Sequence, residues 1–233
     1  MTQKAAINGL YAITPDVTDT SELVAMTQQA LEGGVSLVQY RNKAADSDLR
    51  LHQAHSLARL CQDFQVPFIV NDHLDLAIAV GADGVHLGGK DTSLAEARRR
   101  LGAGKIIGIS CYDQLGRAVE AEQQGADYVA FGAFFASVTK PGATHAPRDL
   151  LAHARQELRL PIIAIGGITP DNGGELIRRG ADAVAVSNAL FCAHDVRLAA
   201  AKISRLIKQN KAKQAFHSSS SSSSSSWANH NVT

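Results

Sequence analysis

The stretch that decides the fold is residues 67–87, PFIVNDHLDLAIAVGADGVHL. It begins with a short apolar run (Pro67–Val70), continues with a segment of helical period (Leu74–Val80) and ends in a second apolar run (Gly84–Leu87). Short apolar runs on either side of a helical segment favour two parallel strands joined by a crossover helix. Gly81 lies between the helix and the second strand, where glycine commonly ends a helix in a left-handed conformation.

The same pattern recurs along the chain from Gly9 to Val186. We expect strands at Gly9–Thr14, Val35–Tyr40, Pro67–Val70, Gly84–Leu87, Lys105–Ile109, Tyr128–Gly132, Ile162–Ile165 and Ala183–Val186. We expect helices at Glu22–Glu32, Asp46–Phe64, Leu74–Val80, Leu94–Leu101, Leu115–Gln124, Arg148–Leu158, Pro170–Arg179 and Val196–Gln209. Strands that are apolar on both faces and joined by helices indicate a buried parallel sheet. Eight such units favour an α/β fold of the (β/α)8 TIM-barrel type.

The overall composition excludes several classes of protein. The chain has 233 residues, 45% of them hydrophobic, which suits one barrel domain. Its 23 basic and 22 acidic side chains give a net charge of +1, so no general attraction to nucleic acid or anionic lipid is expected. No apolar run approaches the length of a membrane span, and no secretion signal is recognisable. We therefore expect a soluble protein that binds small molecules, neither nucleic acid nor membrane, and that is compatible with a homo-oligomer.

The cysteines and the serine-rich end of the chain add two expectations. The three cysteines, Cys61, Cys111 and Cys192, lie far apart without a CxxC spacing, which disfavours disulfides and zinc and favours a cytoplasmic location. Ser218–Ser226 is an unbroken serine run with no apolar face. We expect residues 1–210 to form the barrel domain and residues 211–233 to form a disordered low-complexity tail.

Active sites of such barrels lie at the carboxyl ends of the strands, and a basic pair follows the second predicted strand. Arg41 and Lys43 are two residues apart, so in an extended segment they face the same way. Two converging cations suit a diphosphate. The alternative is an exposed basic loop with no ligand.

Acidic side chains follow the third and fourth predicted strands. Asp72, beside Asn71, and Asp91 offer hard oxygen ligands of the kind that Mg²⁺ prefers. Each aspartate could instead cap a helix, and near Asp91 the Thr92-Ser93 pair could do the capping. His86, inside the fourth strand, is more typical of a hydrogen-bonded barrel residue than of a base or a metal ligand.

Hydroxyl, lysine and glycine groups follow the later strands. Ser110 could bond a phosphate oxygen or cap the next helix, whereas Cys111 has no local histidine partner and is not expected to be a nucleophile. The long segment at residues 131–142 contains Lys140 and suits a mobile cover over an anion. Gly166-Gly167 and Ser187-Asn188, after the last two strands, are typical of a phosphate cup.

At these positions the chain resembles the thiamine phosphate synthase family. The resemblance runs from about Gly9 to Leu190. It rests on Gln39–Lys43 (QYRNK), Val70–Asp72 (VND), Gly84–Asp91 (GVHLGGKD), Gly108–Ser110 (GIS), Ser137–Lys140 (SVTK) and Ala164–Thr169 (AIGGIT).

The resemblance implies a transferase that couples 4-amino-5-hydroxymethyl-2-methylpyrimidine diphosphate to 4-methyl-5-(2-phosphoethyl)thiazole. It implies that C–O cleavage precedes attack and that the departing diphosphate is stabilised electrostatically. Residues implied to hold the pyrimidine diphosphate are Gln39, Arg41, Lys43, Asn71, Ser110 and Lys140, of which Arg41, Lys43, Ser110 and Lys140 would be catalytic. Mg²⁺ would be bound by Asp72 and Asp91. The thiazole phosphate would be held by Ser137, Thr139, Gly167, Val186 and Ser187.

The sequence departs from the usual family pattern at Gly89, Lys90, Ala136 and Arg148. Three other classes of protein compete with the transferase. A thiazole tautomerase or regulatory paralogue would lose the diphosphate and metal residues, which are present here. A sugar-phosphate isomerase or epimerase would need a pair of bases at the strand ends, and a scaffold protein would not need so many polar groups there.

Overall fold

The structure is a computed structural model that describes residues 4–90, 92–137, 142 and 145–222, excluding the side chains of residues 217–222. Its strands are β1 (Gly9–Ile13), β2 (Leu37–Tyr40), β3 (Phe68–Asn71), β4 (Gly84–Leu87), β5 (Ile106–Tyr112), β6 (Tyr128–Phe131), β7 (Ile162–Ile165) and β8 (Ala183–Val186). Its helices are α1 (Thr20–Glu32), α2 (Ser47–Asp63), α3 (Leu74–Ala79), α4 (Leu94–Leu101), α5 (Leu115–Gln123), α6 (Leu150–Glu157), α7 (Gly173–Arg178), α8 (Asn188–Phe191) and α9 (Val196–Ser222).

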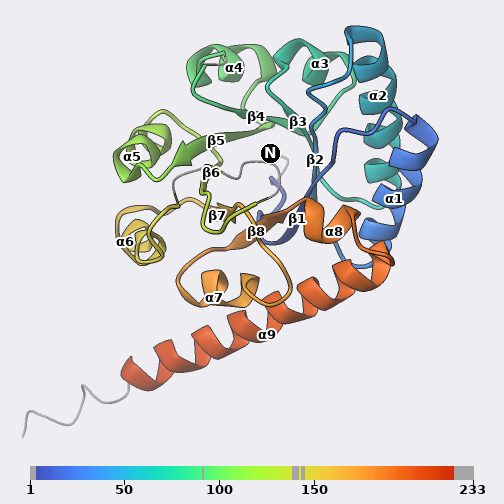
Figure 1. Cartoon of the computed structure of the whole chain (residues 1–233). Coiled ribbons are helices and arrows are strands. Elements are labelled where there is room, and N and C mark those ends of the chain that lie inside the picture. Colours follow the sequence, from blue (N-terminus) through green and yellow to red (C-terminus); the bar gives the residue numbers. More distant parts are fainter. Residues whose placement is uncertain (1–3, 91, 138–141, 143–144, 223–233) are drawn as a thin grey trace, which may run out of the picture.

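The strands form one closed barrel in the order β1 to β8, and every pair is parallel, including β1 with β8. Figure 1 shows the helices arranged around the barrel, with α9 passing beside α7. The predicted (β/α)8 TIM barrel is confirmed. Among the described residues, no helix is long and apolar enough to span a membrane.

Alternating side chains divide the core into two layers. In β1, Tyr11 points into the barrel, whereas Leu10 and Ala12 pack outward against the helices. The inner layer consists of Ile7, Tyr11, Ile13, Leu37, Ile69, Ile106, Tyr128, Ala130, Ile163, Ala183 and Ala185. The strands are therefore apolar on both faces, as the sequence predicts for a buried parallel sheet.

The segment Gly-Ala-Asp occurs three times directly before a strand, at residues 81–83, 125–127 and 180–182, and its aspartates bind the amino-terminal ends of other strands. The carboxylates of Asp83, Asp127 and Asp182 each accept a backbone N–H from the start of the preceding strand, at Phe68, Ile107 and Ile162 respectively, all at 2.8 Å. The aspartate side chains thus accept backbone N–H groups that have no partner in the hydrogen-bond ladder of the sheet. The segment therefore has a structural role.

Two elements extend well past the carboxyl ends that the sequence predicts. Strand β5 continues to Tyr112, so Ser110 and Cys111 lie within it, and its register with β6 shifts between Ser110 and Tyr112. Helix α9 continues beyond Gln209 to Ser222, because lysine, alanine and glutamine after residue 210 are good helix formers that extend an existing helix easily. The tail expected from residue 211 thus begins as a continuation of α9. Residues 223–233 lie outside the described residues, and the division at residue 210 stays a prediction.

One glycine makes room for the largest side chain of the inner layer. A Cβ atom added at Gly108 would lie 1.9 Å from the Tyr128 ring carbon that carries the hydroxyl. Tyr128 is fully buried. We therefore expect Gly108→Ala to lower the free energy of unfolding by about 1–3 kcal/mol or more, as overpacking of a core does. The measurement is denaturant unfolding followed by circular dichroism.

The matched control is Gly116→Ala on α5, where an added Cβ meets nothing within 4 Å. It should leave the stability unchanged or raise it slightly, because alanine is the better helix former. Equal effects of the two substitutions would contradict the tight fit of Tyr128 against Gly108.

Candidate active site

The backbone around the basic pair after β2 is fixed by the segment that follows β1. The Arg41 N–H donates to Thr14 Oγ1 at 3.0 Å, and the same hydroxyl donates to the Arg41 carbonyl at 3.3 Å. The Lys43 N–H donates to an Asp16 carboxylate oxygen at 3.1 Å. Neither the half-buried Arg41 nor the exposed Lys43 forms an ion pair with any described residue. Both positive charges are therefore available to an anion.

Asn71 and Asp72 lie beside the end of β4. Asn71 is paired with His86 in the strand register, and the Asp72 N–H donates to the His86 carbonyl at 2.9 Å. Asp72 is half-buried and has a φ of 64°, a left-handed conformation that aspartate tolerates better than most residues. Ser93 caps α4 by accepting the Glu96 N–H, so it fills the capping role. Asp91 lies outside the described residues.

The Ser110 hydroxyl is hydrogen-bonded to His86 and does not cap the helix that follows. His86 Nε2 lies 2.7 Å from Ser110 Oγ. The N-cap of α5 is Gln114, so the alternative of Ser110 as a helix cap is wrong. The reason is that β5 runs to Tyr112 and carries Ser110 within the sheet. The interpretation of His86 as a hydrogen-bonded barrel residue is confirmed.

Two buried tyrosines extend this contact across the barrel. His86 Nδ1 lies 2.9 Å from the Tyr128 hydroxyl, which lies 2.8 Å from the Tyr11 hydroxyl. Gln39 Nε2 donates to the Tyr11 hydroxyl at 2.9 Å. Burial raises the pKa of Tyr11 and of Tyr128 far above the ordinary value, so both phenols stay neutral. Sequence reasoning missed both tyrosines, although a polar aromatic residue inside an apolar strand was the available signal.

Sequence reasoning also missed Arg117 on α5. Its Nε donates to the Ser110 carbonyl at 2.8 Å, and its guanidinium lies over the Tyr112 ring at 5.6 Å from the centroid. A side chain at Gly89 would begin 3.5 Å from this guanidinium. This is an ordinary van der Waals distance, so Arg117 lies directly beside Gly89, a position that departs from the family pattern.

The glycines after β7 pack against the beginning of the β6–α6 segment. The Phe134 and Phe135 N–H groups donate to the carbonyls of Ile165 and Gly166, at 3.2 and 3.1 Å. Gly167 has a φ of 62°, and a Cβ there would lie 2.4 Å from the Ala136 carbonyl oxygen. This close approach explains why glycine is needed. Of the cover residues, half-buried Ser137 is described, whereas Thr139 and Lys140 lie outside the described residues.

The ends of β7 and β8 offer backbone donors. The N–H groups of Gly167 and Ser187 have no acceptor among the described residues. The Gly167 carbonyl accepts from Asn172 Nδ2 at 3.0 Å, which fixes the turn. Val186 is buried in β8, next to Ser187 at the start of α8. Free backbone N–H groups at this position suit a phosphate.

Arg148, another departure from the family pattern, is engaged within the fold. It pairs with Glu175 of α7 at 3.1 Å and lies over the Phe135 ring at 5.3 Å from the centroid. It therefore connects the β6–α6 segment to α7.

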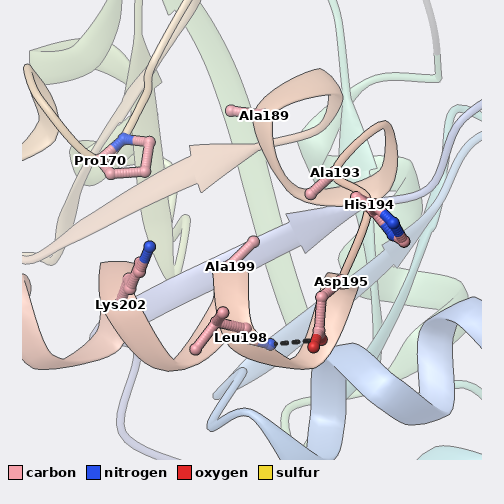
Figure 2. A pocket seen from close by; sticks show the side chains of 8 residues that line it. All are labelled: Pro170, Ala189, Ala193, His194, Asp195, Leu198, Ala199 and Lys202. Carbon is pink, nitrogen blue, oxygen red and sulfur yellow. Dashed lines mark hydrogen bonds between the residues drawn. The ribbon is translucent and has the colours of Figure 1, made fainter.

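A separate hollow lies between α8, α9 and the segment after β7. Figure 2 shows the side chains that line this hollow of about 530 Å³: Pro170, Ala189, Ala193, His194, Asp195, Leu198, Ala199 and Lys202. Asp195 accepts the Leu198 N–H at 2.9 Å and so caps the start of α9. The hollow is mostly apolar and lies outside the barrel, so we place the chemistry at the strand ends.

The strand ends thus carry two sets of groups suited to anions. One set lies at or near the carboxyl ends of β2, β3 and β5, and the other follows β7 and β8, so both sets are at the carboxyl end of the same barrel. Fold and site together define a (β/α)8-barrel enzyme.

Comparisons with known proteins agree with this class. Residues 10–190 match the sequence model of the family described as "Thiamine monophosphate synthase". The chain is 60% identical over 218 residues to the thiamine-phosphate synthase of Nitrosospira multiformis, covering 94% of this chain and 92% of that protein. It is 56% identical over 200 residues to that of Nitrosomonas eutropha, covering 86% and 94%. The solved thiamine phosphate pyrophosphorylase from Pyrococcus furiosus is 34% identical with a TM-score of 0.77, covering 87% and 96%. This chain belongs to the thiamine monophosphate synthase family.

The environments of the three cysteines predict their reactivity. Burial raises the pKa of the Cys61 and Cys111 thiols to about 12, whereas Cys192 is exposed. At pH 8 almost no thiolate forms at the two buried sites, and the thiolate is the reactive species. We expect one fast-reacting thiol per native chain with a disulfide reagent, and three after unfolding. Cys192→Ser should remove the fast reaction, and rapid labelling of Cys111 in the native protein would refute its burial in β5.

Proposed function

We propose that this protein is a cytoplasmic transferase that makes thiamine phosphate. It would join 4-amino-5-hydroxymethyl-2-methylpyrimidine diphosphate to 4-methyl-5-(2-phosphoethyl)thiazole and release diphosphate. The observation that carries this proposal is the presence of two anion-binding sets at one barrel mouth. Two phosphorylated substrates would require two such sets, and the names of the family and of its relatives favour these particular substrates.

The first set would hold the pyrimidine diphosphate. Arg41 and Lys43 are available cations on an anchored loop, and they would bind the diphosphate together with Lys140. Asn71, at the end of β3, and Ser110, in β5, would add hydrogen bonds. Gln39, buried at the end of β2, would contact the pyrimidine ring.

The second set would hold the thiazole phosphate. The N–H groups of Gly167 and Ser187, with the adjacent Val186 backbone, would receive its phosphate. Ser137 and Thr139 would face the thiazole ring from the cover segment. This assignment places the thiazole nitrogen toward the pyrimidine diphosphate.

Catalysis would depend on stabilising the leaving group. The C–O bond of the pyrimidine diphosphate breaks first, and the electron pair leaves with the diphosphate while the pyrimidine stabilises the cation. Arg41, Lys43, Ser110 and Lys140 would counter the charge that develops on the leaving oxygen. The thiazole nitrogen then attacks with its own lone pair, so no proton-abstracting base is required.

Mg²⁺ would suit the carboxylate of Asp72, which follows β3, and that of Asp91, which follows β4 in the sequence and lies outside the described residues. Both would supply carboxylate oxygens, and Mg²⁺ commonly takes one or two protein carboxylates and completes its shell with water and phosphate oxygens. No group of three histidine, cysteine, aspartate or glutamate side chains forms a metal cluster in the described part of the chain. A site with two protein carboxylates does not require such a group of three. When bound, Mg²⁺ would neutralise charge on the diphosphate.

The competing classes lack support from particular residues. A tautomerase or regulatory paralogue would not need Arg41 and Lys43 held with their charges available. An isomerase would need a base, and His86 is committed to two hydrogen bonds inside the barrel.

A coupled assay tests the reaction. We expect purified protein, both substrates and Mg²⁺ to yield thiamine phosphate and diphosphate in equal amounts, measured by chromatography. Omitting either substrate is the control. No product above the enzyme-free reaction would reject the transferase.

The metal assignment predicts a second result. Asp91→Ala should lower kcat at least about 100-fold, the size expected when one electrostatic partner of the transition state is removed. It should also abolish the thermal stabilisation that Mg²⁺ with inorganic diphosphate gives the wild type. The matched control is Asp63→Ala, which removes an exposed carboxylate at the end of α2. If Asp91→Ala kept the wild-type turnover and the wild-type thermal stabilisation by Mg²⁺ with diphosphate, Asp91 would not be a metal ligand.

A further inference from the structure

Five side chains from five strands form one continuous chain of hydrogen bonds across the barrel. It runs from Gln39 (β2) through Tyr11 (β1), Tyr128 (β6) and His86 (β4) to Ser110 (β5), with donor to acceptor distances of 2.9, 2.8, 2.9 and 2.7 Å. Its two ends are residues that the proposed function assigns to the pyrimidine diphosphate. Its three middle members have no assigned role.

Such a chain has only two self-consistent directions. Each hydroxyl carries one hydrogen, and a neutral imidazole donates from one nitrogen and accepts at the other. If Gln39 donates to Tyr11, then Tyr11 donates to Tyr128, Tyr128 donates to His86 Nδ1, and His86 Nε2 donates to Ser110. In the other direction every bond is reversed, and Gln39 must present its oxygen to Tyr11.

The direction decides what the two ends offer to a ligand. In the first direction Ser110 accepts from His86, so its own O–H is left to donate outward. A diphosphate oxygen is an acceptor only, so it requires a donor. At the other end the amide nitrogen of Gln39 faces Tyr11 in the structure. The amide oxygen is then left to accept from an amino group such as that of the pyrimidine.

We propose that Tyr11, Tyr128 and His86 are positioning residues that keep this chain polarised from Gln39 to Ser110. The chain thereby presents an acceptor to the pyrimidine amino group and a donor to the diphosphate before substrate arrives. The identity of these ligands rests on the proposed function, but the polarity does not.

Burial makes the polarity a property of the whole chain. Tyr11 is 1% exposed, Tyr128 is 0% exposed and His86 is 8% exposed. A buried donor or acceptor that loses its partner is costly, so one bond cannot reverse unless its neighbours reverse too. The raised pKa values of both phenols keep their hydrogens in place. The Tyr128 ring also stacks on His86, at 5.6 Å between centroids and an interplanar angle of 20°.

The tautomer of His86 tests the polarity without any activity measurement. We expect long-range ¹⁵N–¹H NMR of the ligand-free protein at pH 8 to show a neutral His86 ring protonated at Nε2. The chain has nine histidines, and the signal missing in His86→Gln assigns the residue. Protonation at Nδ1, or of both nitrogens, would overturn the proposal. This result stands even if the protein makes no thiamine phosphate.

Two substitutions of His86 test its effect on the substrate. Glutamine can place an amide N–H near the position of Nε2 and donate to Ser110, whereas asparagine reaches only the position of Nδ1. We expect His86→Asn to lower kcat/KM for the pyrimidine diphosphate about 10- to 100-fold, as loss of a hydrogen bond to a charged group does. His86→Gln should recover most of this loss. The KM for the thiazole phosphate should change in neither variant.

Tyr128→Phe and a matched tyrosine complete the test. Tyr128→Phe removes the hydroxyl that donates to His86 Nδ1, so we expect a mixture of His86 tautomers and a lower kcat/KM for the pyrimidine diphosphate. Tyr40→Phe is the control, because Tyr40 is equally buried but donates to Gln53 outside the chain. Equal kinetics in His86→Gln and His86→Asn, or equal losses of kcat/KM in both tyrosine variants, would refute the proposal. Tyr11, Tyr128 and His86 would then contribute only packing.

Discussion

The contact between the Tyr128 ring and the backbone of Gly108 is the constraint on which the rest of the site depends. Because residue 108 has no side chain, the ring can occupy the space beside β5 inside the barrel where a Cβ atom would otherwise lie. Its hydroxyl then reaches both Tyr11 and His86. The packing of the inner layer and the hydrogen bonding of the active site are thus set by the same side chain.

The proposed recognition of phosphate would depend on local charges, since the chain as a whole is almost neutral. Backbone anchoring provides the local field. Thr14 and Asp16, which follow β1, fix the segment that carries Arg41 and Lys43. Fixed donors lose little conformational freedom when an anion binds. Ordering of the loop therefore takes away little of the binding free energy.

Much of the fold was predictable because strand and helix periods repeat along the chain, and the barrel order follows from the connections. The ends of β5 and α9 were not predictable, since a sheet register and a packed helix can extend elements through weakly marked residues such as Ser110 and Lys211. For the proposed site, position after a strand was the signal that singled out Arg41, Lys43 and Asp72, whose roles stay predictions. The tyrosine pair was missed because the partners are 117 residues apart and meet only when the barrel closes.

The aspartates of the Gly-Ala-Asp repeats lie at the opposite end of the barrel from the active site. There they secure the starts of β3, β5 and β7, and two of them also pair with arginines, Arg98 and Arg155. Structural bonds and chemical groups therefore occupy different ends of the same strands. Such a separation makes the scaffold evolvable. Substitutions at the carboxyl ends of the strands, such as Gly89 beside Arg117, can accumulate and alter ligand preference while the hydrogen bonds at the amino-terminal ends of the strands stay intact.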